Sequence, residues 1–158
     1  MSRSDLGQFE AVYSKYSDML YRIALSHLLC KEDAEDAVHD VFIKYMNSVF
    51  HFFSEEHEKA WFIRVTVNLC HDMARRRKIR SHAPLEEALT VFEEAGSGEI
   101  MRQILELEDI YKTPILLHYY EGYSVEETAR ILRISVSAVK MRLSRAREKL
   151  KRDFPNEG

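Results

Sequence analysis

The stretch that decides the fold is residues 124–150, with the sequence SVEETARILRISVSAVKMRLSRAREKL. Its first four residues match a capping box, in which the Ser124 hydroxyl accepts the amide N–H of Glu127 and the Glu127 carboxylate accepts the amide N–H of Ser124. Such a box contributes about 1 kcal/mol to placing the start of a helix. The sequence therefore predicts a short helix over residues 125–132.

A second helix follows almost at once. Residues 133–134 leave room only for a tight corner, and Ser135 is placed to cap a helix from residue 136 to about residue 152. Two helices joined this closely must cross, and the small side chain of Ala129 lets them approach each other. The pattern predicts a helix-turn-helix.

The second helix of this pair separates apolar from polar side chains. Its apolar line, which predicts the side that packs in the core, is Val139, Leu143, Ala146 and Leu150. The side chains expected on the outer face and its flanks are Ser137, Lys140, Met141, Arg142, Ser144, Arg145 and Arg147. Such a helix suits the major groove of DNA, where arginine and lysine bond guanine edges and flanking cations neutralise phosphates. The alternative is a cationic amphipathic helix in an ordinary bundle.

Amphipathic helices are also predicted upstream. Apolar residues recur at steps of three and four over residues 6–28, 34–49 and 58–77. Residues 81–98, SHAPLEEALTVFEEAGSG, are typical of a linker because they combine Pro84 with a glycine-rich end. We expect an all-α protein with two small helical domains, at residues 1–80 and 99–158, joined by an acidic flexible linker at residues 81–98.

The composition of the 158 residues agrees with a helical protein. Only 5 Gly and 3 Pro leave few residues for the turns of a many-stranded sheet. The formal net charge of -3 argues, by itself, against nucleic acid as a partner. This average conceals two basic segments, residues 75–80 and 130–152, on either side of residues 81–110, which carry 8 acidic side chains and 1 basic one. Two basic segments predict polyanion binding at two places, unless each is only a solvated helix face.

Several kinds of site are not predicted. Two cysteines, Cys30 and Cys70, give no disulfide framework, and no CxxC or HxxxH spacing suggests zinc, so we expect a reducing compartment and no metal. The seven histidines are scattered, and nothing resembles a nucleophile with a base or a glycine-rich phosphate loop. No apolar run approaches about 18 residues, and residues 1–5 lack the apolar core of a signal peptide. We expect a cytoplasmic protein that is not an enzyme and needs no cofactor.

Three blocks of sequence together resemble a known family. The first is residues 33–42, DAEDAVHDVF; the second is residues 60–68, AWFIRVTVN, with three arginines at 75–77; the third is residues 119–129, YYEGYSVEETA, with residues 139–147, VKMRLSRAR. In this order they resemble the extracytoplasmic-function subfamily of bacterial RNA polymerase sigma factors. The resemblance covers nearly the whole chain. It implies that the first block binds polymerase, the second recognises the minus-ten promoter element and the third recognises the minus-thirty-five element.

The resemblance also implies roles for single residues. The residues that would contact the coiled coil of the polymerase clamp are Asp33, Asp36, His39, Asp40 and Phe42. The residues that would bind the minus-ten element are Phe52, Phe53, Arg64, Asn68, Arg75, Arg76 and Arg77. Among these, Asn68 and the ring of Phe52 or Phe53 would form a pocket for a flipped base, and the arginines would hold phosphates. The outer face of the last helix, defined above from Ser137 to Arg147, would bind the minus-thirty-five element.

The expected function follows from these roles. We expect a subunit that binds core RNA polymerase through its clamp and flap, directs it to promoter DNA, and is regulated by an anti-sigma factor. One alternative is a helix-turn-helix regulator that works without polymerase. It leaves the acidic line of Asp33, Asp36 and Asp40 unexplained and predicts duplex binding by the isolated protein. Another is a helical adaptor whose basic faces bind acidic proteins, which predicts no promoter-dependent transcription.

Overall fold

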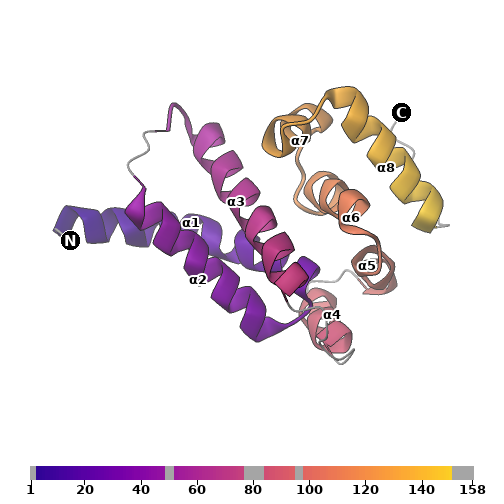
Figure 1. Cartoon of the computed structure of the whole chain (residues 1–158), viewed down its shortest axis with the longest axis horizontal. Coiled ribbons are helices and arrows are strands. Elements are labelled where there is room, and N and C mark those ends of the chain that lie inside the picture. The colour runs from indigo at the N-terminus through magenta and orange to yellow at the C-terminus, as the bar shows by residue number, and fades with distance from the viewer. Residues whose placement is uncertain (1–2, 49–51, 77–83, 95–97, 151–158) are drawn as a thin grey trace. The chain divides into compact units, whose positions relative to one another are not determined.

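The computed structural model describes residues 3–48, 52–76, 84–94 and 98–150, which form helices joined by turns, with no strand among them. In chain order the elements are α1 (Arg3–Leu28), α2 (Lys31–Asn47), α3 (Glu55–Arg76), α4 (Pro84–Glu94), α5 (Gly98–Leu105), α6 (Asp109–Ile115), the π-helix η1 (Leu116–Tyr120), α7 (Val125–Leu132) and α8 (Val136–Leu150) (Figure 1). The expected all-α class is confirmed. Across these described ranges, no helix combines the length and apolarity needed to cross a membrane. The chain forms two compact units, Met1–Ala88 and Leu89–Gly158.

The first unit is built on three long helices, α1, α2 and α3, each packed against the other two (Figure 1). Its core is aromatic at the centre. The fully buried ring of Phe62 on α3 lies with its centroid 4.8 Å from that of Tyr16 on α1 and 5.3 Å from that of Phe42 on α2. Tyr45 and Trp61 pack on the same ring, at 5.1 Å and 5.0 Å. Since ring pairs add about 0.5–1.5 kcal/mol beyond burial, Phe62 ties the three helices together.

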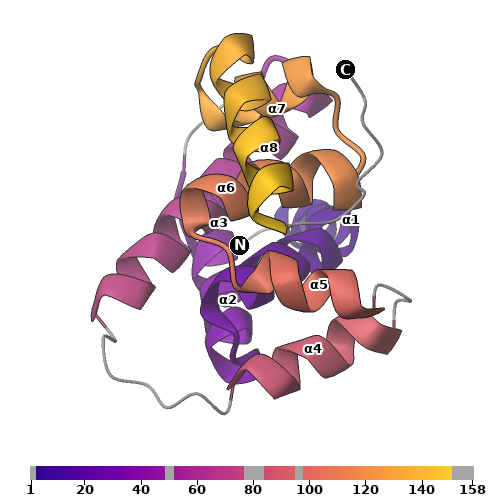
Figure 2. The same ribbon diagram turned by 90° about the vertical axis from the view of Figure 1, so that its right-hand side faces the viewer.

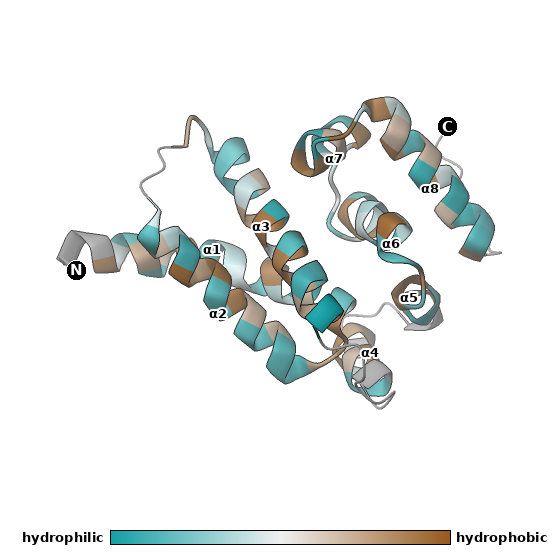
Figure 3. Cartoon of the chain, in the orientation of Figure 1, coloured by the Kyte–Doolittle hydropathy of each residue, from teal (hydrophilic) through white to brown (hydrophobic). Residues whose placement is uncertain are grey.

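Helix α2 has one apolar and one polar side, as its sequence predicts. The buried apolar residues are Ala34, Ala37, Val38, Val41 and Phe42. Figure 3 shows hydrophobic and hydrophilic residues on different sides of this helix and of α8. The period of three and four therefore places the acidic residues between these positions on the outer side of α2.

The segment expected to be a flexible linker contains a helix instead. Residues 84–94 form α4, and Ala88, Leu89 and Phe92 are buried. These positions follow the helical steps of one and three, and Pro84 occupies the first position, where its fixed φ favours helix and its missing N–H costs nothing. Proline and glycine, which are typical of a linker, here flank an amphipathic helix. The remaining linker residues, 81–83 and 95–97, lie outside the described part of the chain.

In the second unit, α6 and α7 pack against α8 (Figure 2). The predicted apolar line of α8 is confirmed, because Val139, Leu143, Ala146 and Leu150 are all buried. Ala129 of α7 is buried too, as expected for a close crossing of the two helices. The helix-turn-helix thus has its own core, and the polar side of α8 lies outside it.

The ends of α7 have the predicted chemistry. The Ser124 hydroxyl accepts from the Glu127 amide at 3.0 Å, and the Glu127 carboxylate accepts from the Ser124 amide at 3.0 Å, so the capping box is present. The Ser135 hydroxyl accepts from the Ala138 amide at 3.0 Å and caps α8. Between the helices, Arg133 adopts the left-handed conformation with φ of 57° and ψ of 44°.

The approach to α7 is held by the segment that follows Pro114. Pro114 lies inside α6, and the next residues form the π-helix η1. The Glu121 amide donates to the Leu116 carbonyl at 2.9 Å, five residues back. His118 Nδ1 lies 2.7 Å from the Tyr123 carbonyl, and because a carbonyl only accepts, the imidazole donates. These contacts fix the residues just before the capping box.

Arg133 is the position where a glycine should stabilise the protein. An L-residue in the left-handed region costs about 1–2 kcal/mol, part of which glycine loses again through its freer unfolded chain. We expect Arg133→Gly to raise the free energy of unfolding of the second unit by about 0.5–1 kcal/mol. Arg130→Gly, three residues earlier inside α7, should lower it by about 1 kcal/mol. Denaturant unfolding of the two variants tests this, and a loss of stability in both would contradict it.

Candidate nucleic-acid interface

The outer face of α8 is open to solvent along its length. Lys140, Ser144 and Arg145 are exposed, and Met141 is 50% exposed. Ser137 in the first turn is exposed as well, and Arg142 is half-buried at the side of the helix. Five of the seven residues predicted from the sequence therefore share one exposed surface. It combines two cations, two serine hydroxyls and one apolar side chain.

Arg147, also predicted for this surface, is held within its own unit. Its guanidinium donates to the hydroxyl of Tyr119 on η1 at 2.8 Å, and the side chain is half-buried. This bond links the last turns of α8 to the segment before α7. Arg147 therefore stabilises the packing of α8 on η1 within the second unit.

The basic end of α3 lies in the first unit. Asn68 is exposed and Arg64 is half-buried on this helix. Arg75 is exposed and pairs with Asp72, one turn earlier. Arg76 is exposed, whereas Arg77 lies outside the described residues. Apart from Arg77, the predicted polar residues of α3 are at least partly accessible.

Phe52 and Phe53, just before α3, differ in their surroundings. Phe52 is half-buried, with its ring centroid 5.8 Å from that of Trp61 and 5.4 Å from that of His57. Phe53 is 95% exposed and stacks on His57 at 5.7 Å. Two adjacent phenylalanines thus offer one packed ring and one open ring.

The first turn of α3 also carries Glu55. Its carboxylate bonds Lys15 on α1, and this hydrogen bond and the charge of Lys15 lower the pKa of the Glu55 carboxyl.

The five residues predicted to bind polymerase separate into two groups, exposed and buried. Asp36, His39 and Asp40 are exposed together on the outer side of α2. Asp33 is 5% exposed in the first turn of the same helix, where a carboxylate favours the positive end of the helix dipole. Phe42 is buried in the core. Asp36, His39 and Asp40 are therefore the fully exposed members of this set, whereas Asp33 and most of Phe42 are covered.

A groove of about 530 Å³ lies between α1 and α2, beside these exposed residues. Its apolar wall includes Phe9, Tyr13 and Phe42, and the Tyr13 and Phe42 ring centroids are 4.8 Å apart. Burial raises the pKa of the Tyr21 hydroxyl, and the nearby Glu35 carboxylate raises it further, so this phenol stays neutral in the groove. Sequence analysis missed the groove because its walls come from two helices.

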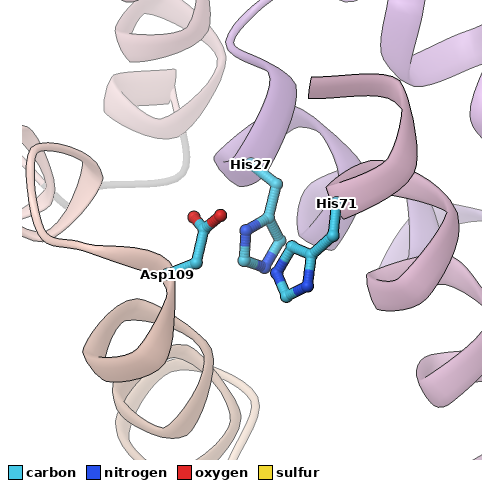
Figure 4. A group of neighbouring side chains, drawn as sticks. All are labelled: His27, His71 and Asp109. Atoms are coloured by element: carbon cyan, nitrogen blue, oxygen red, sulfur yellow. The ribbon is translucent and has the colours of Figure 1, made fainter. Parts of the chain in front are cut away.

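Two of the scattered histidines are brought together. His27 on α1 and His71 on α3 lie with their rings edge to face, at a centroid distance of 5.4 Å (Figure 4). Neighbouring Cys70 is fully buried. Two imidazoles are fewer than the four ligands of a structural zinc site, and within the described part of the first unit no third ligand joins them. The pair is a contact between helices of the first core.

Two family models match the chain: Sigma-70 region 2 over residues 12–80, and Sigma-70, region 4, over residues 97–150. RNA polymerase sigma factor SigV of Bacillus subtilis is 31% identical over 130 residues, covering 80% of this chain and 78% of its own. The chain belongs to the extracytoplasmic-function (ECF) sigma factors.

The chain is also similar to a second sigma factor and to a solved structure. The ECF RNA polymerase sigma factor SigM of Mycobacterium tuberculosis is 29% identical over 148 residues, covering 91% of this chain and 76% of its own. The solved structure of CnrH in complex with the cytosolic domain of CnrY is 27% identical, covers 90% of this chain and 84% of its own, and has a TM-score of 0.69. In this ECF sigma factor, region 2 corresponds to α1–α3 and region 4 to α5–α8. Helix α4 lies between the two matches.

Proposed function

We propose that this ECF sigma factor binds core RNA polymerase and directs it to promoters by recognising the minus-ten and minus-thirty-five elements with different units. The observation that carries the proposal is a pair of separate exposed surfaces, one on each sigma region. The outer face of α8 combines Lys140, Ser144 and Arg145, and region 2 carries an open aromatic ring at Phe53, before α3, and an exposed amide at Asn68, further along that helix. One suits duplex DNA and the other suits unpaired bases.

The α8 surface supports recognition of the minus-thirty-five element in the major groove. Its exposed cations can bond guanine edges or phosphates, and the apolar side chain of Met141 can contact a thymine methyl group. Short side chains such as Ser144 leave little reach for base edges. We therefore expect groove shape and phosphate contacts to contribute to selectivity.

The region 2 surface supports opening of the minus-ten element. A base that leaves the stack needs an aromatic face and a hydrogen-bonding partner, and a stacked base recovers about 1–3 kcal/mol. Phe53 supplies an open face just before α3. Asn68 lies 13 residues beyond the first residue of α3, about 20 Å along the helix axis, so its exposed amide is placed for a different base of the separated strand. Arg64 and Arg76 supply positive charge for the backbone of the separated strand.

The α2 surface supports polymerase binding. The aromatic groove between α1 and α2 has the acidic side chains of Asp18 and Glu35 in its lining, and Asp36 and Asp40 are exposed on α2, next in sequence to the lining residues Glu35 and His39. An apolar centre with a charged rim is the usual composition of a protein interface. A basic partner segment suits this surface, and we assign it to the coiled coil of the polymerase clamp. CnrH was solved in complex with the cytosolic domain of CnrY, and RpoE of Bartonella quintana in complex with the anti-sigma factor NepR, so we expect an anti-sigma partner for this chain too.

Run-off transcription tests the proposal directly. The full chain is combined with core polymerase and genomic fragments, and initiation at defined start sites is the expected result. Absence of initiation at every fragment, with a folded chain and a core enzyme active with another sigma factor, would contradict it. Specific binding of duplex DNA by the isolated chain, equal to that of the holoenzyme, would favour the polymerase-independent regulator.

Arg145 is the residue on α8 most suited to reading a base. We expect Arg145→Ala to weaken promoter use by about 1–3 kcal/mol at the preferred minus-thirty-five sequence. The loss should shrink on templates altered at one base pair, because the contact is already missing there. Transcription from a set of single-base variants measures this. Glu148→Ala, exposed on the same helix, is the control and should keep the preference. A loss equal on all templates would assign Arg145 to phosphate instead.

A further inference from the structure

The open ring of Phe53 is held in place by its own backbone. Ser54 precedes α3 and accepts the amide N–H of His57 on its hydroxyl at 3.1 Å. In return, His57 Nδ1 accepts the amide N–H of Phe53 at 3.2 Å. The Ser54 carbonyl also accepts the first helical bond, from the Glu58 amide at 3.1 Å. The backbone at residue 53 is therefore fixed to the first turn of a helix that is 22 residues long.

The arrangement is a variant of the capping box. In the usual box the third helical residue is glutamate or glutamine and accepts from the capping residue itself. Here His57 occupies that position and accepts from the residue before the cap. The bond requires an unprotonated Nδ1, so the imidazole carries its proton on Nε2. His57 thus binds the backbone amide of Phe53 and also contacts its ring.

The ring of His57 also contacts the rings of both phenylalanines before α3. The Phe53 ring stacks on the His57 imidazole, with 17° between the planes and 5.7 Å between centroids. On the other side, Phe52 meets the imidazole edge-on, with 80° between planes, and packs on Trp61. His57 is half-buried between them. The imidazole therefore meets the Phe53 ring at an offset, and with 95% of the residue exposed most of the ring surface stays open to a further stacking partner.

We infer that His57 is a positioning residue, which orients Phe53 as the stacking platform for an unpaired base while Phe52 serves as internal support. The inference rests on the proposed minus-ten function and deepens it. An exposed phenylalanine at the end of a loop would otherwise sample several rotamers, and fixing them on binding costs about 0.5–1.5 kcal/mol. A ring already stacked and tied through its backbone loses less on binding. The ligand class is a nucleobase of single-stranded DNA, recognised by its flat face.

The test uses holoenzyme assembled from core polymerase and the full-length chain. The probe is a fluorescently labelled single-stranded oligonucleotide with the non-template minus-ten bases of a promoter that wild-type holoenzyme transcribes. We expect Phe53→Ala to weaken binding of this probe by about 5- to 150-fold, the loss of one stacked base. His57→Ala should weaken it by about 2- to 10-fold, the loss of a hydrogen bond and its ring support.

The conservative variant is His57→Asn, whose side-chain oxygen can take the place of Nδ1 as acceptor. We expect it to bind the probe more tightly than His57→Ala, although it lacks the ring. A second readout is a 2-aminopurine base in the probe, whose fluorescence is quenched by stacking and should recover in Phe53→Ala and, in part, in His57→Ala. Leu6→Ala, which also removes an exposed apolar side chain from region 2, is the control and should match the wild type.

The outcomes separate the inference from the proposed function. If Phe53→Ala weakens binding of the probe but both His57 variants bind it as the wild type does, His57 does not position the ring and the inference is overturned. Equal weakening by His57→Asn and His57→Ala would overturn the role of the hydrogen bond. A wild-type holoenzyme that initiates nowhere would overturn the proposed function and this inference with it.

Discussion

Reversing two exposed charges on α2, Asp36→Arg with Asp40→Arg, should abolish the binding of core RNA polymerase. Both carboxylates are exposed on α2, next in sequence to Glu35 and His39, which line the groove between α1 and α2. The change replaces two negative charges with two positive ones opposite a basic partner. Like charges placed together across an interface cost several kcal/mol, so we expect the affinity for core polymerase to fall by about 100-fold or more.

The double variant should keep its fold, because the changed side chains take no part in the core. Arginine is also a better helix former than aspartate. Co-purification with core polymerase measures the binding, and circular dichroism measures the helix content. Glu106→Arg with Glu148→Arg makes the same change of charge at two exposed positions of region 4 and should retain binding. Unchanged co-purification of the α2 variant with core would remove the acidic surface from the proposal.

The sequence predicts most of the helices because each has a strong local signal. The capping box at Ser124, the cap at Ser135 and the apolar line of α8 lie where they were expected. These features depend on residues within about one or two turns of each other, where spacing alone decides which side chains meet. Helix α4 does not follow from the sequence as clearly, because its apolar period, Ala88 to Phe92, is short and is flanked by the turn-forming residues Pro84 and Gly96.

The residues of the candidate sites also divide into those that local spacing predicts and those that depend on tertiary packing. Exposed residues on one helix, such as Lys140 and Arg145 on α8, follow directly from helical spacing. Burial depends on what packs against a helix, so the sequence did not reveal that Asp33 points inward. Pairs that join two helices, such as His27 and His71, need the tertiary fold. His57 is a local case that was still missed, because histidine is not the residue that defines a capping box.

The core of region 2 should depend on Phe62 more than on any single surface residue. We expect Phe62→Ala to lower the free energy of unfolding of this unit by about 3–5 kcal/mol, a large part of the stability of a small domain. The ring is fully buried and touches aromatic rings from α1, α2 and α3, so its removal leaves a cavity that no single helix can fill. Phe62→Leu, which keeps most of the volume, should cost about 1–1.5 kcal/mol.

Hydrogen exchange resolved along the chain measures where the stability is lost. Phe62→Ala should reduce the protection of amides in α1–α3 and leave that of α6–α8 nearly unchanged, because each unit has its own core. The matched variant in the second unit is Phe92→Ala, whose ring is buried on α4 and packs on Tyr120 of η1. It should show the opposite pattern. If both variants reduced protection equally in α2 and α8, the two regions would unfold as one cooperative unit, and separate recognition of two promoter elements would lose its structural basis.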